Sequence, residues 1–247
     1  MHRTVTWLVV VGAIAWAALT ADVEMAKFGK AGPRLWDFLS RMVPPDFTIW
    51  QDMLRGLAET LQIAILGTLF AVILSVFLGV LASETLMQPY IWRSTRALLA
   101  AIRAIPLILV AMLMVGAVGL GLLPGILAIT FHATGMLSKF YAEAIDNVAA
   151  GPITALQSAG ASRQQQLRYG IWPQMAPVIL RDTVFRFELN LRESLVLGVV
   201  GAGGIGLYIQ TYVRSFQYEK AATATLTVII LVLLSELANG YLKKRVT

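Results

Sequence analysis

Residues 60–82 read TLQIAILGTLFAVILSVFLGVLA, a run that contains no charged residue. A helix of this length extends about 35 Å, and the hydrocarbon core of a bilayer is about 30 Å thick. The run is therefore long and apolar enough to cross a membrane once. We expect it to be a transmembrane helix.

The composition of the whole 247-residue chain agrees with this expectation. Apolar residues make up 57% of the chain and charged residues 14%, and the mean hydropathy is +0.72. Soluble domains usually carry about 25% charged and about 45–50% apolar residues. One core in a chain of this size cannot hide such an excess. The composition excludes soluble globular and disordered proteins and predicts an all-α polytopic membrane protein.

Five further apolar runs complete the predicted topology. The long run 104–138 exceeds one crossing, and we divide it at residues 116–125 because Gly and Pro interrupt helices. The first run also fits a secretory signal, and we expect it to be an uncleaved first helix. We predict a single membrane domain over residues 1–247. Its six spans are 5–21, 60–82, 97–115, 124–139, 177–200 and 221–242.

The basic residues predict the orientation of the spans. Arginines occur in the loops after the second and fourth spans, and the chain closes on Lys243, Lys244 and Arg245. The positive-inside rule makes this side cytoplasmic, so we expect both termini in the cytoplasm. The segment 22–55 departs from the rule. It carries these basic residues on the outside: Lys27, Lys30, Arg34, Arg41 and Arg55.

The sequence lacks the residues that several kinds of protein chemistry require. The chain has no cysteine, and His2 and His132 lack the spacing of metal ligands. Gly29-Lys30 lacks the remaining residues of a phosphate-binding loop. The net charge of +6 is scattered between apolar runs, which does not suggest nucleic-acid binding. We expect no catalytic residue, metal or cofactor in this chain, and we expect His132 to be packed or hydrogen-bonded.

The glycine-rich stretch GAGGIG at residues 201–206 matches the dinucleotide-binding pattern G-x-G-x-x-G. That pattern has its meaning only between a strand and a helix. Here it lies between two predicted membrane helices. We interpret it as a turn at which backbones approach closely, serving as a gate or a packing point. Its glycines are Gly201, Gly203, Gly204 and Gly206.

The fifth span carries charges at a depth where each costs about 2.5–3.5 kcal/mol if it faces lipid. They are Arg181, Asp182, Arg186, Glu188, Arg192 and Glu193. Two ion pairs are favoured by the spacing, Glu188 with Arg192 and Asp182 with Arg186, because each acid precedes its base by four residues. The charges sum to zero. They either form a network that fixes helix packing or line a water-filled path for a charged solute, and both readings stay open.

The segment 141–173 joins the fourth and fifth spans on the cytoplasmic side. Gly151-Pro152 opens a short helix, Gly160 separates it from a second, and Gly170 and Pro173 end the second helix. Two short helices exposed to the cytosol have the form of an element that docks into a groove of a partner.

This segment resembles the cytoplasmic EAA loop of permeases from ATP-binding-cassette importers. Ala155, Gly160 and Pro173 match its pattern, whereas Thr154 stands where the family usually has Glu. The resemblance implies that the segment is the coupling helix that seats in an ATPase subunit. The residues implied in coupling are Thr154, Ala155, Gly160, Ala161, Ser162 and Pro173.

The stretches FRFELNLR (185–192) and VLGVVGAGGIG (196–206) are similar to the permeases of phosphonate importers. This resemblance implies a type I importer of two permeases, two ATPases and an external binding protein, with the two permeases as a homodimer. ATP and Mg²⁺ would be bound by the ATPase. The path would pass phosphonate, phosphite, hypophosphite or phosphate. The residues implied in the path are Arg181, Arg186, Glu188, Arg192 and Glu193.

Two other functions stay open at this point. One is a membrane-embedded enzyme that acts on a lipid phosphate, although the chain lacks a nucleophile beside a base or a set of metal ligands. The other is an importer permease for another small solute, such as an amino acid, which the cytoplasmic loop alone would permit.

Overall fold

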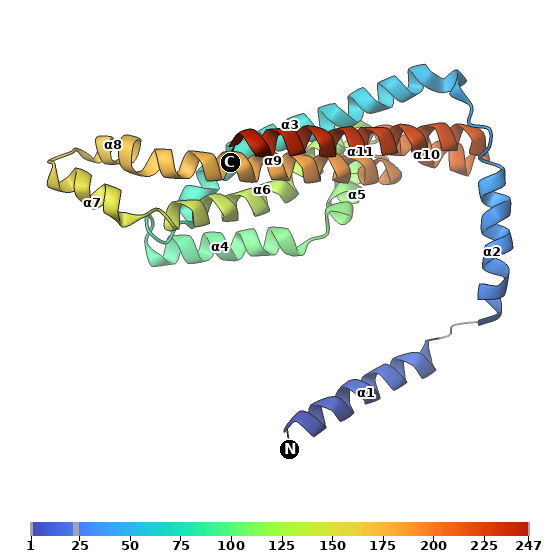
Figure 1. Cartoon of the computed structure of the whole chain (residues 1–247), viewed down its shortest axis with the longest axis horizontal. Coiled ribbons are helices and arrows are strands. Elements are labelled where there is room, and N and C mark those ends of the chain that lie inside the picture. The colour runs from blue at the N-terminus through green and yellow to red at the C-terminus, as the bar shows by residue number, and fades with distance from the viewer. Residues whose placement is uncertain (1, 22–24, 247) are drawn as a thin grey trace. The chain divides into compact units, whose positions relative to one another are not determined.

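The computed structural model describes residues 2–21 and 25–246, without the side chains of residues 2, 25–28, 163 and 238–246. The basic side chains at 243–245, which entered the orientation argument, therefore lie outside the described part. The chain divides into two compact units, Met1–Pro44 and Pro45–Thr247. The helices of both units are labelled in Figure 1.

The first unit holds two helices that differ in character. Helix α1 (His2–Thr20) is apolar around its whole circumference, and each of its described side chains is exposed. It covers the first predicted span except Ala21. Helix α2 (Met25–Ser40) is amphipathic and contains Pro33. An ion pair of 2.9 Å between the Arg41 guanidinium and the Asp37 carboxylate closes the last turn of α2.

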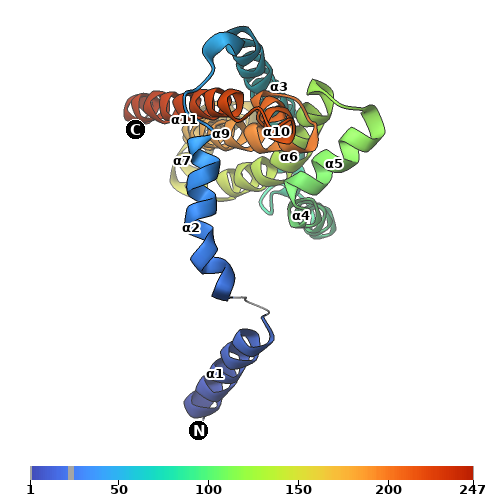
Figure 2. The same cartoon turned by 90° about the vertical axis from the view of Figure 1, so that its right-hand side faces the viewer.

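The second unit is a helical bundle with α6 (Leu122–Asp146) at its centre. Helices α3 (Trp50–Ala82) and α9 (Trp172–Leu197) pack on α6 and on each other, and α4 (Pro89–Ala104) packs on α3 and α6. Figures 1 and 2 show these four helices side by side. Small residues let α3 and α6 approach closely. A Cβ at Gly67 would lie 2.6 Å from the Ile129 side chain, so this contact requires glycine.

The predicted helix 97–115 is wrong as a single element. Helix α4 ends at Ala104, α5 (Leu107–Val118) follows, and the two are bent by 84°. The bend lies at Ile105-Pro106, because proline has no N–H to donate and its ring disfavours a helical residue before it. The expected interruption at 116–125 is also shorter. Gly116 belongs to α5 and Pro124 to the first turn of α6.

The segment of the chain that follows α9 forms one end of the bundle. A short helical turn, η3 (Gly198–Val200), leads into the glycine-rich stretch, and α10 (Ile205–Arg214) begins directly after it. Helix α11 (Tyr218–Val246) then packs on α9 and α10. In Figure 1 this end lies opposite the end that carries α7 (Ala150–Ser158).

The segment between α6 and α9 differs from its prediction in one respect. Helix α7 forms as expected and Gly160 ends it, but the second helix does not stop at Gly170 and Pro173. From α8 (Arg163–Gln165) a π-helical segment, η2 (Gln166–Ile171), continues directly into α9. The N–H of Trp172 bonds the carbonyl of Leu167, and the change of hydrogen-bond register accommodates Pro173 in the first turn of α9.

The number of membrane crossings is not confirmed as six. Four helices of the described residues are long and apolar enough to cross a membrane, and five if the bent pair α4–α5 counts as one span. The central helix α6 is not among them, although residues along its whole length are buried. It is covered by neighbouring helices, so it does not need a continuous apolar surface.

Candidate functional site

Arg186 on α9 is the most deeply buried charged side chain of the described residues, with 1% of its surface exposed. Its Nη2 donates to the Glu193 carboxylate at 2.7 Å and lies 3.1 Å from Nδ1 of His132 on α6. Its Nη1 lies 3.5 Å from the Met136 sulfur. The arginine therefore fastens α9 to α6, with Glu193 supplying the compensating charge. His132 takes part in a hydrogen bond, as expected.

A second ion-pair cluster lies on a more exposed side of α9. The Arg192 guanidinium contacts Glu188 at 2.9 Å and Glu236 of α11 at 2.7 Å. The pair of Glu188 with Arg192 thus forms as the spacing predicted. The other predicted pair is wrong, because Asp182 contacts the neighbouring Arg181 at 3.0 Å, not Arg186. Arg186 pairs instead with Glu193, seven residues further along the same face of α9.

A polar contact that the sequence analysis missed joins α9 to α3. Asn190 is fully buried, and its Nδ2 donates to Thr68 Oγ1 at 2.8 Å. Asn190 Oδ1 and Arg186 Nε are buried and have no hydrogen-bond partner in the described structure. The signal was present in the sequence, since an Asn in an apolar stretch of a membrane helix commonly makes a bond between helices.

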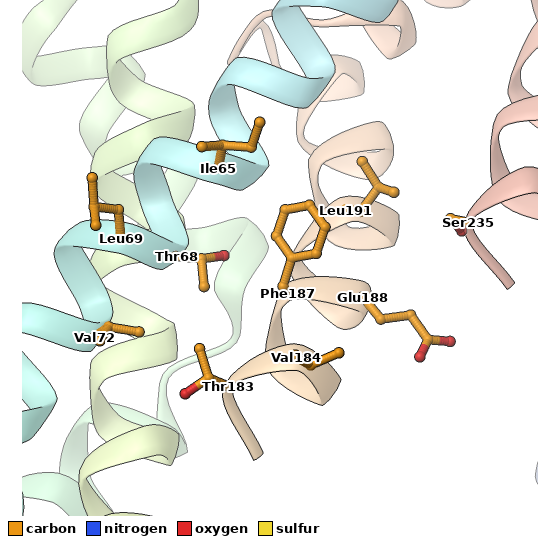
Figure 3. Close-up of a pocket in the computed structure, with 10 residues that line it drawn as sticks. All are labelled: Ile65, Thr68, Leu69, Val72, Thr183, Val184, Phe187, Glu188, Leu191 and Ser235. Carbon is orange, nitrogen blue, oxygen red and sulfur yellow. The ribbon is translucent and has the colours of Figure 1, made fainter. Parts of the chain in front are cut away.

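An apolar groove of about 460 Å³ runs between α3, α9 and α11. Figure 3 shows its lining, with Thr68 on α3 and Phe187 on α9 among the side chains and Glu188 and Ser235 toward α11. The carboxylate of Glu188 would repel an anion here, and the surface that the other side chains expose to the groove is almost wholly apolar. The groove suits hydrocarbon or an apolar side chain and is not an anion site.

The glycine-rich turn is held by two side chains of α3. Glu59 accepts a hydrogen bond from the N–H of Gly204 at 3.1 Å, and Thr60 Oγ1 accepts one from the N–H of Ile205 at 3.0 Å. Together they cap the N-terminus of α10. Gly204 has φ +75°, and a Cβ there would lie 2.8 Å from Thr60 Oγ1. A Cβ at Gly203 or Gly206 would meet the backbone of another segment, whereas one at Gly201 would meet the Leu120 side chain. Glu59 and Thr60 are partners that the sequence did not indicate.

Substituting Gly206 by Ala tests this close packing. A Cβ at Gly206 would overlap the carbonyl oxygen of Leu195 and lie 3.1 Å from Gly198 Cα. We expect Gly206→Ala to cost about 1–3 kcal/mol and to lower the Tm of the purified protein by several degrees. Gly116→Ala is the matched control, since beyond the neighbouring backbone of its own helix no atom lies within 4 Å of its Cβ position. Equal Tm values for the two variants would contradict a close-packed turn.

Five of the six predicted coupling residues lie on α7 or directly after it. Helix α7 buries none of its residues, and Thr154 and Ala155 are exposed. Gly160 has φ +76°, and the N–H groups of Gly160 and Ala161 bond the carbonyls of Gln157 and Leu156, which terminates the helix. Ser162 then caps the next helix: its N–H donates to Gln165 Oε1 at 2.7 Å, and its Oγ accepts from the N–H of Gln165. Pro173 lies apart from this cluster, at the start of α9.

The base of this segment is fastened to the rest of the bundle by Asp146, the last residue of α6. Its carboxylate accepts hydrogen bonds from Ser83 Oγ at 2.7 Å and the N–H of Thr85 at 3.0 Å, and it pairs with Arg96 at 2.7 Å. Burial raises the pKa of Asp146, but the hydrogen bonds outweigh burial and leave the pKa below its ordinary value. The α3–α4 loop and the α6–α7 junction are thereby linked.

The described residues show no group of three or more His, Asp or Glu side chains that could hold a metal ion. The arrangement on α9 consists of matched acids and arginines and lacks a nucleophile next to a base. What the residues can do is hold helices together and present charge to a solute or a partner.

Comparison with known proteins places the chain among transport proteins. A family described as "Binding-protein-dependent transport system inner membrane component" matches residues 71–247. The phosphite transport system permease protein PtxC of Stutzerimonas stutzeri is 37% identical over 213 residues, which cover 86% of this chain and 78% of PtxC. The phosphate-import permease protein PhnE of Mycolicibacterium smegmatis is 39% identical over 195 residues, 78% of this chain and 37% of PhnE.

A solved structure supports the fold. A chain of the MetNI methionine ABC transporter, in an inward-facing conformation, matches with a TM-score of 0.71 and 23% sequence identity. The match covers 82% of this chain and 99% of the other. At this identity the likeness concerns the helical architecture alone.

Proposed function

Because the chain belongs to the family of binding-protein-dependent transport system inner membrane components, we propose that it forms the translocation path of an importer for a phosphorus oxyanion. Members of this family are transport subunits of ATP-binding-cassette importers, and the ATPase activity belongs to a separate subunit. The chain is accordingly a membrane-spanning permease and not an enzyme. The substrate class, the partners of this chain and the roles of its residues are the content of the proposal.

The observation that carries the proposal is the form of the α7 segment. Helix α7 has no buried residue and packs on η2, and α8 continues through η2 into the charged helix α9 without a break in helical structure. A partner that moves α7 therefore acts on the helix that carries the arginines. ATP-driven closure of the ATPase pair would rock the two permeases between inward-open and outward-open states. ATP and Mg²⁺ are bound by the ATPase in this scheme.

Arg181 and Arg192 are the arginines that we assign to the path. The side chains of these two arginines are exposed to solvent in part. That of Arg186 is enclosed by Glu193, His132 and Met136. An exposed guanidinium attracts a phosphorus oxyanion, and its pairing with Glu188 and Glu236 keeps that attraction weak enough for release. Arg186 and Glu193 then hold α9 in position, so packing and path lining are divided between two faces of one helix.

The remaining partners follow from the family. We propose two permeases, two ATPase subunits and an external binding protein, in the inner membrane with α7 and both termini on the cytoplasmic side. The second permease is a copy of this chain or a related chain. The similarity to PtxC and PhnE, whose names specify phosphite and phosphate, supports a phosphorus oxyanion as the solute.

Uptake by cells tests the substrate class. In cells that lack other importers of phosphorus oxyanions, the chain expressed with its ATPase and binding protein should raise the uptake of labelled phosphite, phosphate or methylphosphonate. Arg192→Gln should lower that uptake about tenfold with assembly intact, because it removes the charge that faces the solute. Arg93→Gln, at an exposed position of α4, is the control. Uptake of labelled methionine in place of all three anions would contradict the proposal.

A further inference from the structure

A small pocket with basic walls lies between α4 and α6. Its volume is about 90 Å³, roughly three times the share of one water molecule in the liquid. Its charged lining comes from Arg96 and Arg103 of α4 and from Lys139 and Glu143 of α6, and the other lining residues are apolar. The pocket is thus the size of a single small anion and has three cations to one acid in its walls.

The three cations differ in how far they are neutralised. Arg96 is committed to Asp146 at 2.7 Å, with Glu84 further away at 3.9 Å. Lys139 lies 3.4 Å from Glu143. Arg103 donates its Nε to the Leu99 carbonyl at 3.3 Å, and within the described residues no carboxylate pairs with it. Arg103 therefore retains donors and a full charge for an anion in the pocket.

The surroundings of the pocket resemble a membrane interface. Arg96 lies over the Trp92 ring at 4.8 Å, and Arg93 lies over the same ring at 5.2 Å. Tryptophan collects at the boundary of the bilayer, and arginines there extend toward the headgroups. The loop before α4 is fastened to Asp146 at the base of the α7 segment, which is the cytoplasmic side in our scheme. Anionic headgroups of that leaflet are attracted to basic pockets between helices.

We propose that this pocket binds one phosphate group, held by Arg103 and Lys139 at the junction of α4 and α6. The group comes either from the headgroup of an anionic lipid or from inorganic phosphate in the cytosol. Its bound oxygens accept hydrogen bonds from the two cations, and the small volume admits the phosphate but not the rest of a lipid, which remains outside along α4. The site is separate from the charges of α9 and does not depend on which solute is transported.

Thermal unfolding of the purified complex of this chain with its ATPase tests the site. The protein is stripped of lipid in neutral detergent and titrated with dioctanoyl phosphatidylglycerol, dioctanoyl phosphatidylcholine or inorganic phosphate at constant ionic strength. We expect phosphatidylglycerol to raise the Tm and phosphatidylcholine to do so far less. Arg103→Gln should raise the phosphatidylglycerol concentration that gives half of the maximal Tm increase at least about tenfold, because a charge-assisted contact is lost. Arg214→Gln, at an exposed position at the end of α10 and outside the pocket lining, should leave that concentration unchanged.

The outcomes separate the sources of phosphate. Stabilisation by phosphatidylglycerol alone identifies a lipid site, and equal stabilisation by inorganic phosphate identifies a site for the free anion. If Arg103→Gln does not fold, Lys139→Gln replaces it with the same expected shift. The proposal would be overturned if the two lipids raised the Tm equally and inorganic phosphate did not raise it. It would also be overturned if neither pocket variant changed the ligand concentration at half of the maximal Tm increase.

Discussion

Replacing Glu193 by Gln is expected to lower the stability of the protein by roughly 3 kcal/mol, which corresponds to a drop in Tm of about 6–12 °C. The substitution keeps the size of the side chain and removes its charge. Arg186 then remains buried, at 1% exposure, and no other carboxylate of the described residues pairs with it. A buried charge without a counter-charge is among the most costly defects that a single substitution creates. Thermal unfolding of the purified protein measures the effect.

The same change at Glu236 provides a matched control. Glu236 contacts Arg192 at 2.7 Å, the same distance as Glu193 to Arg186, but its side chain is 51% exposed and Arg192 keeps Glu188 as a second partner. Glu236→Gln should therefore cost at most about 1 kcal/mol. A double variant, Arg186→Met with Glu193→Gln, should recover most of the lost stability because it removes the unpaired charge. Equal losses for Glu193→Gln and Glu236→Gln would show that burial of Arg186 does not determine the effect.

Ala155→Arg is expected to release the ATPase subunit from the complex. Ala155 is exposed on α7, so the chain itself can accept the larger side chain without a change in its own packing. A helix seated in a groove of a partner cannot accept that side chain without a clash. A loss of at least 1.4 kcal/mol of binding free energy weakens the association tenfold or more. Gly160 is a poorer position for this test, because its φ of +76° strains any side chain. Recovery of the ATPase on a tag carried by this chain measures the effect.

Ala97→Arg serves as the control for that experiment. Ala97 is exposed on α4, outside the α7 segment, and the substitution introduces the same side chain. The ATPase should co-purify with this variant as with the unmodified chain. Undiminished recovery with Ala155→Arg would mean that α7 does not seat in the ATPase, and the coupling role of the segment would have to be abandoned.

The long apolar runs predicted where most helices lie, because the length of an apolar run reports directly on helices packed in a membrane. The break at Pro106 was missed for the same reason. The run 97–115 carries a single charge, Arg103, so its mean hydropathy gave no sign of the 84° bend between α4 and α5. The sequence predicts that a helix ends at Gly170 and Pro173, yet the helix passes through both. Gly170 makes room for Leu156 of α7, since a Cβ there would lie 3.1 Å from the leucine side chain.

The contacts of the candidate site were predicted only where they are local. Spacing within α9 identified the pair of Glu188 with Arg192, four residues apart. It could not identify His132 as a neighbour of Arg186, or Thr68 as the partner of Asn190, because these contacts depend on how α6 and α3 pack on α9. Arg103 carried a signal that was not used. A charge inside the predicted third span should have indicated either a break in that span or a binding site.

The most direct test of the account is to measure transport and ATP hydrolysis in the same proteoliposomes, with this chain, its ATPase and its binding protein reconstituted together. The account predicts that labelled phosphite, phosphate or methylphosphonate accumulates only when ATP is available to the ATPase. It also predicts that excess methionine does not compete and that Ala155→Arg abolishes accumulation. Accumulation that does not require ATP, or that methionine blocks, would contradict the assignment of this chain as the ATP-coupled path for a phosphorus oxyanion.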